Sequence, residues 1–332
     1  MAYSVTLIPG DGIGPEVTGA TQEVLRAAGA PIEWEVVQAG QAAFDATGEP
    51  VPAGVFASIR HNRIALKGPL TTPKGKGFRS ANVTIRQELS LYTGLRPVRS
   101  LPGIETPYSD VDLVVLRENT EDLYAGIEHE ILPGHVISLK VSTRAAGERI
   151  SRWAFEYMRY RGRRRISCSA KPNVSPLTDG AFVDAFHSVG SDYPFIEQDS
   201  LPVDNLAMQL AQDPTGFDVL LLQNLYGDIL SDLCAGLVGG LGVVPGANVG
   251  DRIAVFEAVH GTAPDIAGQG VANPLAVLMS GVMMLEFMGE QKIADRVTQA
   301  IWRVLSSGKR LTRDLGGSEG TAGFTAALIE EL

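Results

Sequence analysis

The chain has 332 residues, of which 45% are hydrophobic and 20% are charged, a composition typical of globular rather than disordered proteins. Its 28 lysines and arginines against 38 aspartates and glutamates give a formal net charge of −10. Because an acidic surface repels phosphate backbones, we expect no nucleic-acid partner. The two cysteines, Cys168 and Cys234, form neither a disulfide framework nor a zinc motif, which favours a reducing compartment.

The N-terminal segment has a short apolar run without a preceding basic stretch, and Pro9 interrupts it. This pattern does not match a secretion signal. The most apolar stretches, 233–244 and 276–288, are too short or too rich in glycine to cross a bilayer. We therefore expect a soluble, cytoplasmic protein with no membrane partner.

Short apolar runs alternate with amphipathic stretches along the chain, which predicts an α/β fold. Predicted strands cover 3–8, 32–37, 111–116, 218–222 and 253–255. Predicted helices cover 16–27, 81–92, 144–159, 180–189, 206–212, 229–237, 274–288 and 291–305. No internal repeat and no low-complexity linker divides the chain, so we expect interleaved domains rather than domains in series.

Glycine is abundant, with 37 residues or about 11% of the chain against an average near 7%. The first cluster, Gly10, Gly12 and Gly14, lies between a predicted strand and a predicted helix, as a dinucleotide-binding loop does. Its spacing departs from the G-x-G-x-x-G pattern, and no acidic residue ends a second strand at the expected distance. A standard Rossmann domain is therefore not predicted.

The segment 159–165 is the one dense block of basic residues in the sequence. Such a block resembles a nucleic-acid patch. Because it follows an amphipathic helix and precedes a strand, we interpret it as a solvent-exposed turn.

Two aspartates, Asp228 and Asp232, are four residues apart and share one face of a predicted helix. Carboxylates so placed repel each other unless a cation neutralises them, and they are ligands that suit Mg²⁺ or Mn²⁺. A third carboxylate, Asp204, could complete such a site. Alternatively, Asp228 caps the helix and Asp232 is a solvated residue of its first turn.

A polar face is predicted on the helix 81–92, where Asn82 and Arg86 are four residues apart behind an N-cap Ser80. Arg96 and Arg117 add two guanidinium groups, the latter at the carboxyl end of a strand, where ligands of α/β proteins collect. Because an arginine can hold a carboxylate with two hydrogen bonds, the three arginines suit a polycarboxylate. Taken singly, each could instead be a surface ion-pair partner.

Together these motifs resemble the metal-dependent decarboxylating 2-hydroxyacid dehydrogenases, namely the isocitrate, homoisocitrate and 3-isopropylmalate dehydrogenases. The resemblance covers essentially the whole chain in order. Its motifs are 10–16, Ser80-x-Asn82-x-x-x-Arg86, Leu95-Arg96-Pro97, 117–121, Asn224-x-x-Gly227-Asp228 with Asp232, and 260–268. The resemblance implies one large mixed sheet flanked by helices, with the active site between two interleaved domains. These are a large, coenzyme-side domain of 1–97 plus 250–332 and a small domain of 98–249 with the dimer interface and metal site.

The resemblance also implies a homodimer, or a higher oligomer, whose active sites share residues across the interface. Asp228 and Asp232 are implied as metal ligands from one subunit, and Asp204 as a ligand from the other. Lys171, also from the partner subunit, is implied on the base side of alcohol oxidation, and Tyr124 in protonation of the enol.

Two prolines depart from the family pattern beside these residues. Pro172 follows the implied base Lys171 and favours an extended backbone there, while Pro202 stands where an apolar strand residue is usual.

The choice of coenzyme is implied by the residues after the segment 260–264. NADP-using relatives commonly have Lys-Tyr there, whereas Asp265 and Ile266 stand in this chain. Because a carboxylate accepts hydrogen bonds from ribose hydroxyls and repels a 2′-phosphate, we predict NAD. The other coenzyme-binding residues implied are Ile13, Thr72, Glu257, His260, Gly261, Thr262, Ala263 and Asn273.

A hydroxyl at Ser80 and an amide at Asn82 suit a third carboxylate of the substrate. An isopropyl group would leave each polar group unpaired at about 1 to 3 kcal/mol. We therefore predict NAD-dependent oxidative decarboxylation of isocitrate to 2-oxoglutarate and CO2 with Mg²⁺ or Mn²⁺, the tricarboxylate also binding Arg86, Arg96 and Arg117. Homoisocitrate is the second candidate substrate and 3-isopropylmalate the third.

An alternative of another class is a non-catalytic regulatory subunit of a heteromeric isocitrate dehydrogenase. Such subunits typically lose the tyrosine, the lysine or the metal aspartates. Because this chain keeps all of them, the catalytic interpretation is favoured.

Overall fold

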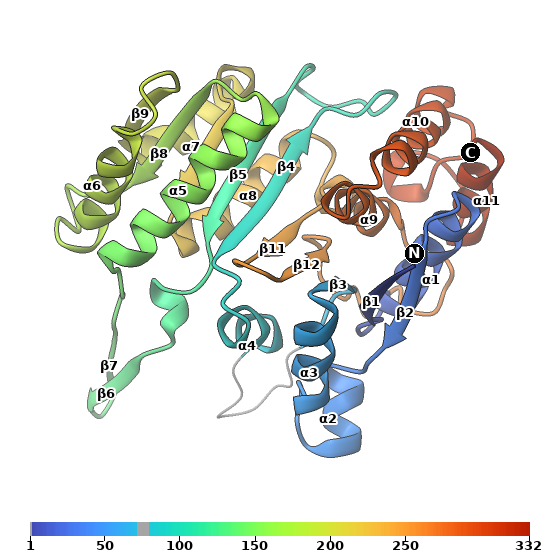
Figure 1. Cartoon of the computed structure of the whole chain (residues 1–332), viewed down its shortest axis with the longest axis horizontal. Coiled ribbons are helices and arrows are strands. Elements are labelled where there is room, and N and C mark those ends of the chain that lie inside the picture. Colours follow the sequence, from blue (N-terminus) through green and yellow to red (C-terminus); the bar gives the residue numbers. More distant parts are fainter. Residues whose placement is uncertain (1, 72–79) are drawn as a thin grey trace.

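The computed structural model describes residues 2–71 and 80–332. The strands in these residues are β1 (Tyr3–Ile8), β2 (Ile32–Val36), β3 (Ile64–Lys67), β4 (Thr93–Arg99), β5 (Asp112–Glu118), β6 (Glu128–Leu132), β7 (His135–Ser138), β8 (Arg165–Ala170), β9 (Glu197–Pro202), β10 (Val219–Leu222), β11 (Ala247–Val249) and β12 (Ala254–Glu257). Ten of them form one sheet in the order β2-β1-β3-β12-β11-β4-β5-β10-β8-β9, and β6 pairs with β7 in a separate hairpin (Figure 1).

The sheet consists of two parallel blocks joined by an antiparallel centre. β2, β1, β3 and β12 are parallel to one another, as are β5, β10, β8 and β9. Between the blocks, β11 is antiparallel to both β12 and β4, and β4 is antiparallel to β5. A parallel strand covered on both faces should be apolar throughout, and β10 with the sequence VLLL is buried at every position.

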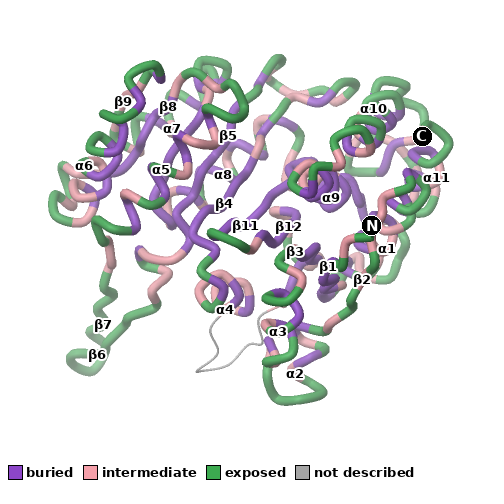
Figure 2. The backbone as a smooth tube through the Cα atoms, in the orientation of Figure 1, coloured by how far each residue is buried: buried purple, intermediate pink, exposed green. Residues whose placement is uncertain are grey.

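The helices are α1 (Gly14–Ala27), α2 (Gln41–Thr47), α3 (Ala53–Asn62), α4 (Ala81–Glu88), α5 (Arg144–Arg161), α6 (Thr178–Gly190), α7 (Val203–Gln212), α8 (Asn224–Leu237), α9 (Leu275–Phe287), α10 (Gln291–Ser307) and α11 (Thr321–Glu330). On the half of the sheet that ends in β9, α5 and α6 cover one face and α7 and α8 the other (Figure 1). On the other half, α1, α9, α10 and α11 pack together. The buried positions follow the sheet and α9 (Figure 2). The predicted α/β fold with one large mixed sheet is confirmed.

The apolar stretch near residue 280 is a core helix. α9 buries most of its residues on every side, in agreement with its uniformly apolar sequence. In the described ranges we find no helix with the length and apolarity that a bilayer crossing requires.

Most predicted helices and strands form, although several boundaries differ. The helix predicted over 81–92 ends at Glu88, and Ser90 follows with a positive φ of 51° before β4 begins. The helix predicted over 229–237 begins at Asn224 instead, which places Asp228 inside it. β4 was not predicted, because Arg96 and Pro97 interrupt its apolar pattern.

Two prolines in strands are tolerated because of their positions in the sheet. β11 covers only Thr93–Leu95 of β4, so Pro97 lies where one side of β4 has no neighbouring strand. Pro202 ends the edge strand β9 and is also the N-cap residue of α7. The departure at Pro202 therefore leaves the sheet intact.

The first and last helices of the chain pack against each other. The Glu16 carboxylate of α1 accepts hydrogen bonds from the Ala272 backbone, at 2.9 Å, and from the Thr321 hydroxyl of α11. β12 lies beside β3 in the sheet, so segments from both ends of the chain share one half of the molecule (Figure 1). The division into 1–97 plus 250–332 and 98–249 stays a prediction.

Candidate active site

A pocket of about 150 Å³ lies beside the antiparallel centre of the sheet. Its lining joins residues from separate predicted motifs, namely Asn82, Arg86, Arg96, Arg117, Asp228, Asp232, Glu257, His260 and Gly261. Lys67 and Ser231, which the sequence analysis did not single out, also line it. The structure therefore brings together predicted substrate, metal and coenzyme residues.

The sheet register places the cationic side chains on one face. Gly94 of β4 pairs with Arg117 of β5, and because side chains alternate along a strand, Arg96 shares that face. Lys67 at the end of β3 pairs with Glu257 at the end of β12. The pocket thus forms where β3, β12, β4 and β5 approach one another.

Two glycines permit close packing around these arginines. A Cβ atom at Gly227 would lie 2.6 Å from Cγ of Arg117, and one at Gly246 would collide with the Arg96 guanidinium. Neither glycine has a positive φ, so the missing side chain, rather than backbone freedom, explains glycine at both positions.

A buried charge cluster forms one wall of the pocket. The Glu257 carboxylate lies 2.5 Å from Lys67 Nζ, 3.1 Å from Arg86 Nη2 and 3.6 Å from Arg96 Nη2. Burial alone raises the pKa of Glu257, but the three cations outweigh it and hold that pKa below its usual range. Burial lowers the pKa of Lys67 despite its pairing with Glu257. One carboxylate neutralises only part of this positive charge.

A second cluster surrounds Arg117. Its Nε donates to Asn224 Oδ1 at 2.9 Å, and its Nη1 donates to Asp228. The Tyr124 hydroxyl, from a short 3-10 helix at Leu123–Ala125, donates to the other oxygen of Asp228. The Arg117 guanidinium also stacks on the Tyr124 ring at 4.9 Å. Burial, followed by the hydrogen bond to Asp228, raises the pKa of Tyr124, so the phenol is held protonated.

Several buried polar atoms of the pocket lack partners. Among the described residues, Asn82 Oδ1, Arg86 Nε, Arg117 Nη2 and His260 Nε2 have none. Buried polar atoms are normally hydrogen-bonded, so an unpaired group at a pocket points to a polar ligand. Burial also lowers the pKa of His260, which favours the neutral imidazole.

Asp228 and Asp232 lie one turn apart on α8 and both line the pocket. The alternative in which Asp228 caps the helix is wrong, because α8 begins at Asn224 and the Asp228 carboxylate pairs with Arg117 and Tyr124. Two carboxylates at this spacing fit a hard divalent cation. Within 2–71 and 80–332, no cluster of three or more acidic, histidine or cysteine side chains could hold a metal ion.

Lys171 and Asp204 do not line this pocket. Lys171 directly follows β8 and Asp204 lies in the first turn of α7, and the two form an ion pair with each other. Ser80 is the N-cap residue of α4, and its side chain makes no capping hydrogen bond.

The predicted coenzyme residues gather around the first glycine cluster. Ile13 N donates to Thr262 O at 2.9 Å, and a Cβ at Gly12 would overlap the Thr262 backbone. The segment 10–14 therefore packs directly on 260–263. Thr72 lies outside the described residues.

The remaining coenzyme residues have contrasting environments. Asp265 is exposed and Ile266 partly buried, in the turn that follows Ala263. Asn273 is buried, and its side chain donates to Asp314 at 2.8 Å and accepts from Leu275 N at 2.9 Å. The Glu257 carboxylate contacts the three cations and accepts a hydrogen bond from Asn248, and its role in coenzyme binding stays a prediction.

Lys67 is the main residue that the sequence analysis missed. It ends the short apolar run Ile64–Leu66, and a lysine at the end of a buried strand needs an acidic partner. The lysine at the end of an apolar run was therefore visible in the sequence as a sign of a buried ion pair. Its acidic partner could not be identified, because Glu257 is 190 residues away in the sequence.

The fold and the pocket define an α/β protein with a site for a compact, multiply charged anion beside a pair of carboxylates. A family model described as isocitrate/isopropylmalate dehydrogenase matches residues 4–332. The chain therefore belongs to the isocitrate/isopropylmalate dehydrogenase family, whose members are decarboxylating dehydrogenases.

Relatives with either coenzyme in their names are similar to this chain. The mitochondrial NAD isocitrate dehydrogenase catalytic subunit 5 of Arabidopsis thaliana is 48% identical over 99% of this chain and 88% of its own length. The NADP isocitrate dehydrogenase of Thermus thermophilus is 47% identical over 99% of this chain and 67% of its own length. A crystal structure of isocitrate dehydrogenase from Methylococcus capsulatus has a TM-score of 0.96 at 48% identity, covering 99% of both chains.

Proposed function

We propose that this protein is an NAD-dependent isocitrate dehydrogenase, which oxidises and decarboxylates isocitrate to 2-oxoglutarate and CO2 with Mg²⁺ or Mn²⁺. The observation that carries the proposal is the convergence of Arg86, Arg96 and Arg117 on one pocket with unpaired donor atoms. Guanidinium groups of this kind suit several carboxylates held at once.

The charge balance of the pocket supports a tricarboxylate with a divalent cation. Its cationic side chains are Lys67, Arg86, Arg96 and Arg117, and its carboxylates are Asp228, Asp232 and Glu257. The site therefore carries one excess positive charge, and a bound divalent cation raises the excess to three. A fully ionised tricarboxylate neutralises that charge.

Asp228 and Asp232 would hold the divalent cation. When bound, such a cation lowers the pKa of a hydroxyl group and stabilises negative charge on a neighbouring oxygen. Arg117 already pairs with Asp228 and orients it. The three arginines fix the substrate carboxylates and so hold the reacting carbon in place.

Proton transfer is assigned to Tyr124 and Lys171. The Tyr124 hydroxyl is protonated and held at Asp228, so it is placed to return a proton to the product carbon. We assign the partner subunit's Lys171 to the base side of the oxidation, and its amino group must be deprotonated, outside the ion pair with Asp204, before it accepts the proton of the substrate hydroxyl. The partner subunit's Asp204 provides the third carboxylate.

This assignment requires a homodimer, which the surface supports. Exposed large hydrophobic side chains concentrate in 98–249, including Met208 on α7 and Ile229 on α8. The β6–β7 hairpin projects from the molecule and exposes Ile131 and Val136, which are 58% and 64% accessible (Figure 2). Such apolar surface is typical of a protein interface.

The proposal of NAD rests on Asp265. Its side chain is exposed and forms no hydrogen bond or ion pair within the described residues, so the carboxylate is available to ribose hydroxyls. A carboxylate at that position would repel a 2′-phosphate.

A coenzyme-reduction panel tests the proposal. Purified protein is assayed with isocitrate, homoisocitrate or 3-isopropylmalate, each with NAD or NADP, with Mg²⁺ or a chelator. We expect the highest kcat/KM with isocitrate, NAD and Mg²⁺ and loss of the reaction with chelator. Preference for another substrate or for NADP would refute that part of the proposal, and no reduction in any arm would favour a regulatory subunit.

A further inference from the structure

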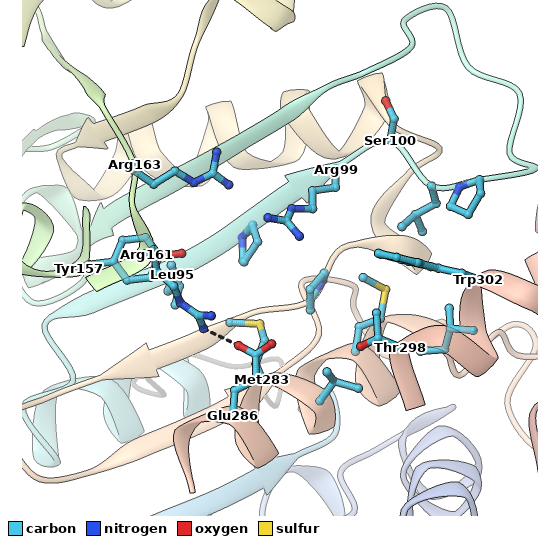
Figure 3. Close-up of a pocket in the computed structure, with 17 residues that line it drawn as sticks. Leu95, Arg99, Ser100, Tyr157, Arg161, Arg163, Met283, Glu286, Thr298 and Trp302 are labelled. Carbon is cyan, nitrogen blue, oxygen red and sulfur yellow. Dashed lines mark hydrogen bonds and ion pairs between the residues drawn. The ribbon is translucent and has the colours of Figure 1, made fainter. Parts of the chain in front are cut away.

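A second cavity, of about 520 Å³, is lined by residues of β4, α5, α9 and α10 (Figure 3). It lies on the opposite face of β4 from the candidate active site. Side chains alternate along β4, so Leu95, Pro97 and Arg99 line this cavity while Arg96 lines the active-site pocket. The volume lies in the range of about 300 to 1,000 Å³ that is typical of small-molecule sites.

The wall opposite β4 is apolar and adaptable. It consists of side chains from α9 and α10, among them Met279, Met283 and Trp302 (Figure 3). Methionines adjust their shape to a ligand with little strain. Trp302 is 47% accessible although it is a large apolar side chain. This wall suits the hydrocarbon part of a ligand.

The other end of the cavity is lined by three guanidinium groups, those of Arg99 at the end of β4, Arg161 at the end of α5 and Arg163 in the turn after it (Figure 3). Glu286 is the one acidic side chain among the lining residues, and Asp112 and Asp218 pair with Arg99 and Arg163 from outside the lining. Arg161 donates to Glu286 and so connects α5 with α9. The block 159–165 was predicted to be a solvated turn, and this holds only in part, because Arg161 and Arg163 face the cavity.

Tyr157 lies among these guanidinium groups. It lines the cavity, and its hydroxyl has no hydrogen-bond partner in the part of the chain that the structure describes. Burial raises the pKa of Tyr157, while Arg161, Arg163 and Arg99 act in the opposite direction. The phenol therefore provides an unused donor beside the guanidinium groups.

We propose that this cavity binds a small amphipathic carboxylate. The hydrocarbon part lies between β4 and the two helices α9 and α10, and the carboxylate accepts hydrogen bonds from Arg99, Arg161 and the Tyr157 hydroxyl. Asp112, Asp218 and Glu286 balance the charge of the three arginines, so the selection rests on hydrogen-bond donors. Within the described residues only Nε of Arg99 and Nη2 of Arg161 are hydrogen-bonded, and their other N–H groups suit a carboxylate, which accepts two hydrogen bonds from a guanidinium group. The proposal does not depend on the reaction at the other pocket.

The cavity and the active-site pocket lie on the two faces of the same strand, β4. Leu95 and Pro97 are the chain neighbours of Arg96, so a ligand in the cavity contacts the strand that carries a proposed substrate residue. It also contacts α5 and α9, which belong to the two predicted domains.

Binding of decanoate to the full chain, measured by isothermal titration calorimetry, tests the proposal. We expect saturable binding with one decanoate per chain, and binding of decanol at least tenfold weaker. Arg99→Gln should weaken decanoate binding at least tenfold, and Val282→Phe, which fills the cavity, should abolish it. Arg159→Gln is the matched control, because it removes the same charge from an exposed part of α5 where Arg159 pairs with Glu156.

Absence of saturable binding, or equal affinities for Arg99→Gln and Arg159→Gln, would overturn the proposal. Within the described residues the one ion-pair partner of Arg99 is Asp112, which Arg163 also holds, so Arg99→Gln should fold normally. Thermal unfolding of Arg99→Gln, compared with that of the unsubstituted protein, checks that the variant is folded. The binding affinity of Arg99→Gln then tests the proposal even if Val282→Phe does not fold.

Discussion

The side chains of Lys171 and Asp204 form an ion pair in which Nζ lies 2.5 Å from Oδ1, outside the pocket where Asp228 and Asp232 meet. In a single chain, Lys171, the proposed base, and Asp204, the proposed third carboxylate, therefore lie away from the pocket that holds the other proposed site residues. Exchange of these residues between two subunits of a symmetric dimer would complete two equal sites.

Complementation between inactive variants tests this arrangement. Lys171→Ala and Asp228→Asn should each be inactive, but a mixed dimer holds one intact site. We expect an equal mixture, assembled by co-expression, to recover about one quarter of the activity, since half of the dimers are mixed and each has one working site.

The matched control combines Asp228→Asn with Asp232→Asn. In the proposed arrangement, each site takes both Asp228 and Asp232 from the same subunit. Every site in this mixed dimer therefore has one damaged aspartate, and no activity should return. If Lys171→Ala and Asp228→Asn also fail to complement each other, Lys171 is not supplied by the partner subunit.

Glu257→Gln should destabilise the protein strongly. The substitution leaves Lys67, Arg86 and Arg96 buried without a carboxylate, and breaking a buried ion pair costs about 3 to 5 kcal/mol. Glu88→Gln is the control, because the exposed pair with Arg60 should contribute at most about 1 kcal/mol. Urea unfolding at pH 7 measures both losses, and equal losses would contradict the importance of the cluster.

The effect of Glu257→Gln should also depend on pH. Because the pKa of Glu257 is lower in the folded than in the unfolded state, its stabilisation is complete above the ordinary carboxyl pKa and is lost as the pH falls below it. The difference in unfolding free energy between the unsubstituted protein and the variant should be constant above about pH 5 and shrink toward pH 3. A difference that grows in acid would contradict the direction of this pKa shift.

Ser80→Leu should reduce kcat/KM for isocitrate by about 10- to 100-fold, because it removes a hydroxyl partner of the substrate and adds bulk. The side chain makes no capping hydrogen bond, so the helix itself should lose little stability. Ser80→Ala separates the loss of the hydroxyl from the added bulk. The same loss with 3-isopropylmalate would remove the basis for assigning the substrate from this residue.

Asp265→Lys combined with Ile266→Tyr should raise the ratio of kcat/KM for NADP to that for NAD by at least about 100-fold. The first change replaces repulsion of the 2′-phosphate with attraction. Asp265→Asn alone removes only the repulsion and should shift the ratio less. An unchanged ratio in the double variant would show that coenzyme choice lies elsewhere.

Some features of the site could be predicted because they depend on local spacing. Asp228 and Asp232 share a helix face wherever the helix begins, so an error in its start did not affect that prediction. Asn82 and Arg86 were predicted on the same basis, and both line the pocket.

Other features depend on contacts between distant segments. Lys67 ends β3, a strand whose apolar run is too short to recognise, and its buried ammonium group is paired because Glu257 reaches it from β12. The separation of Lys171 and Asp204 from the pocket depends on tertiary structure as well. No local pattern contains that information.

The order of strands in the sheet constrains how the protein folds during synthesis. β1, β2 and β3 leave the ribosome first, yet the neighbour that covers the open edge of β3 is β12, which is made after all the other strands. The block of β5, β8, β9 and β10 comes from one continuous segment and can pair earlier. The edge of β3 therefore stays unpaired until β12 has been synthesised. Lys67 lacks its carboxylate partner Glu257 during the same period, which ends late in translation.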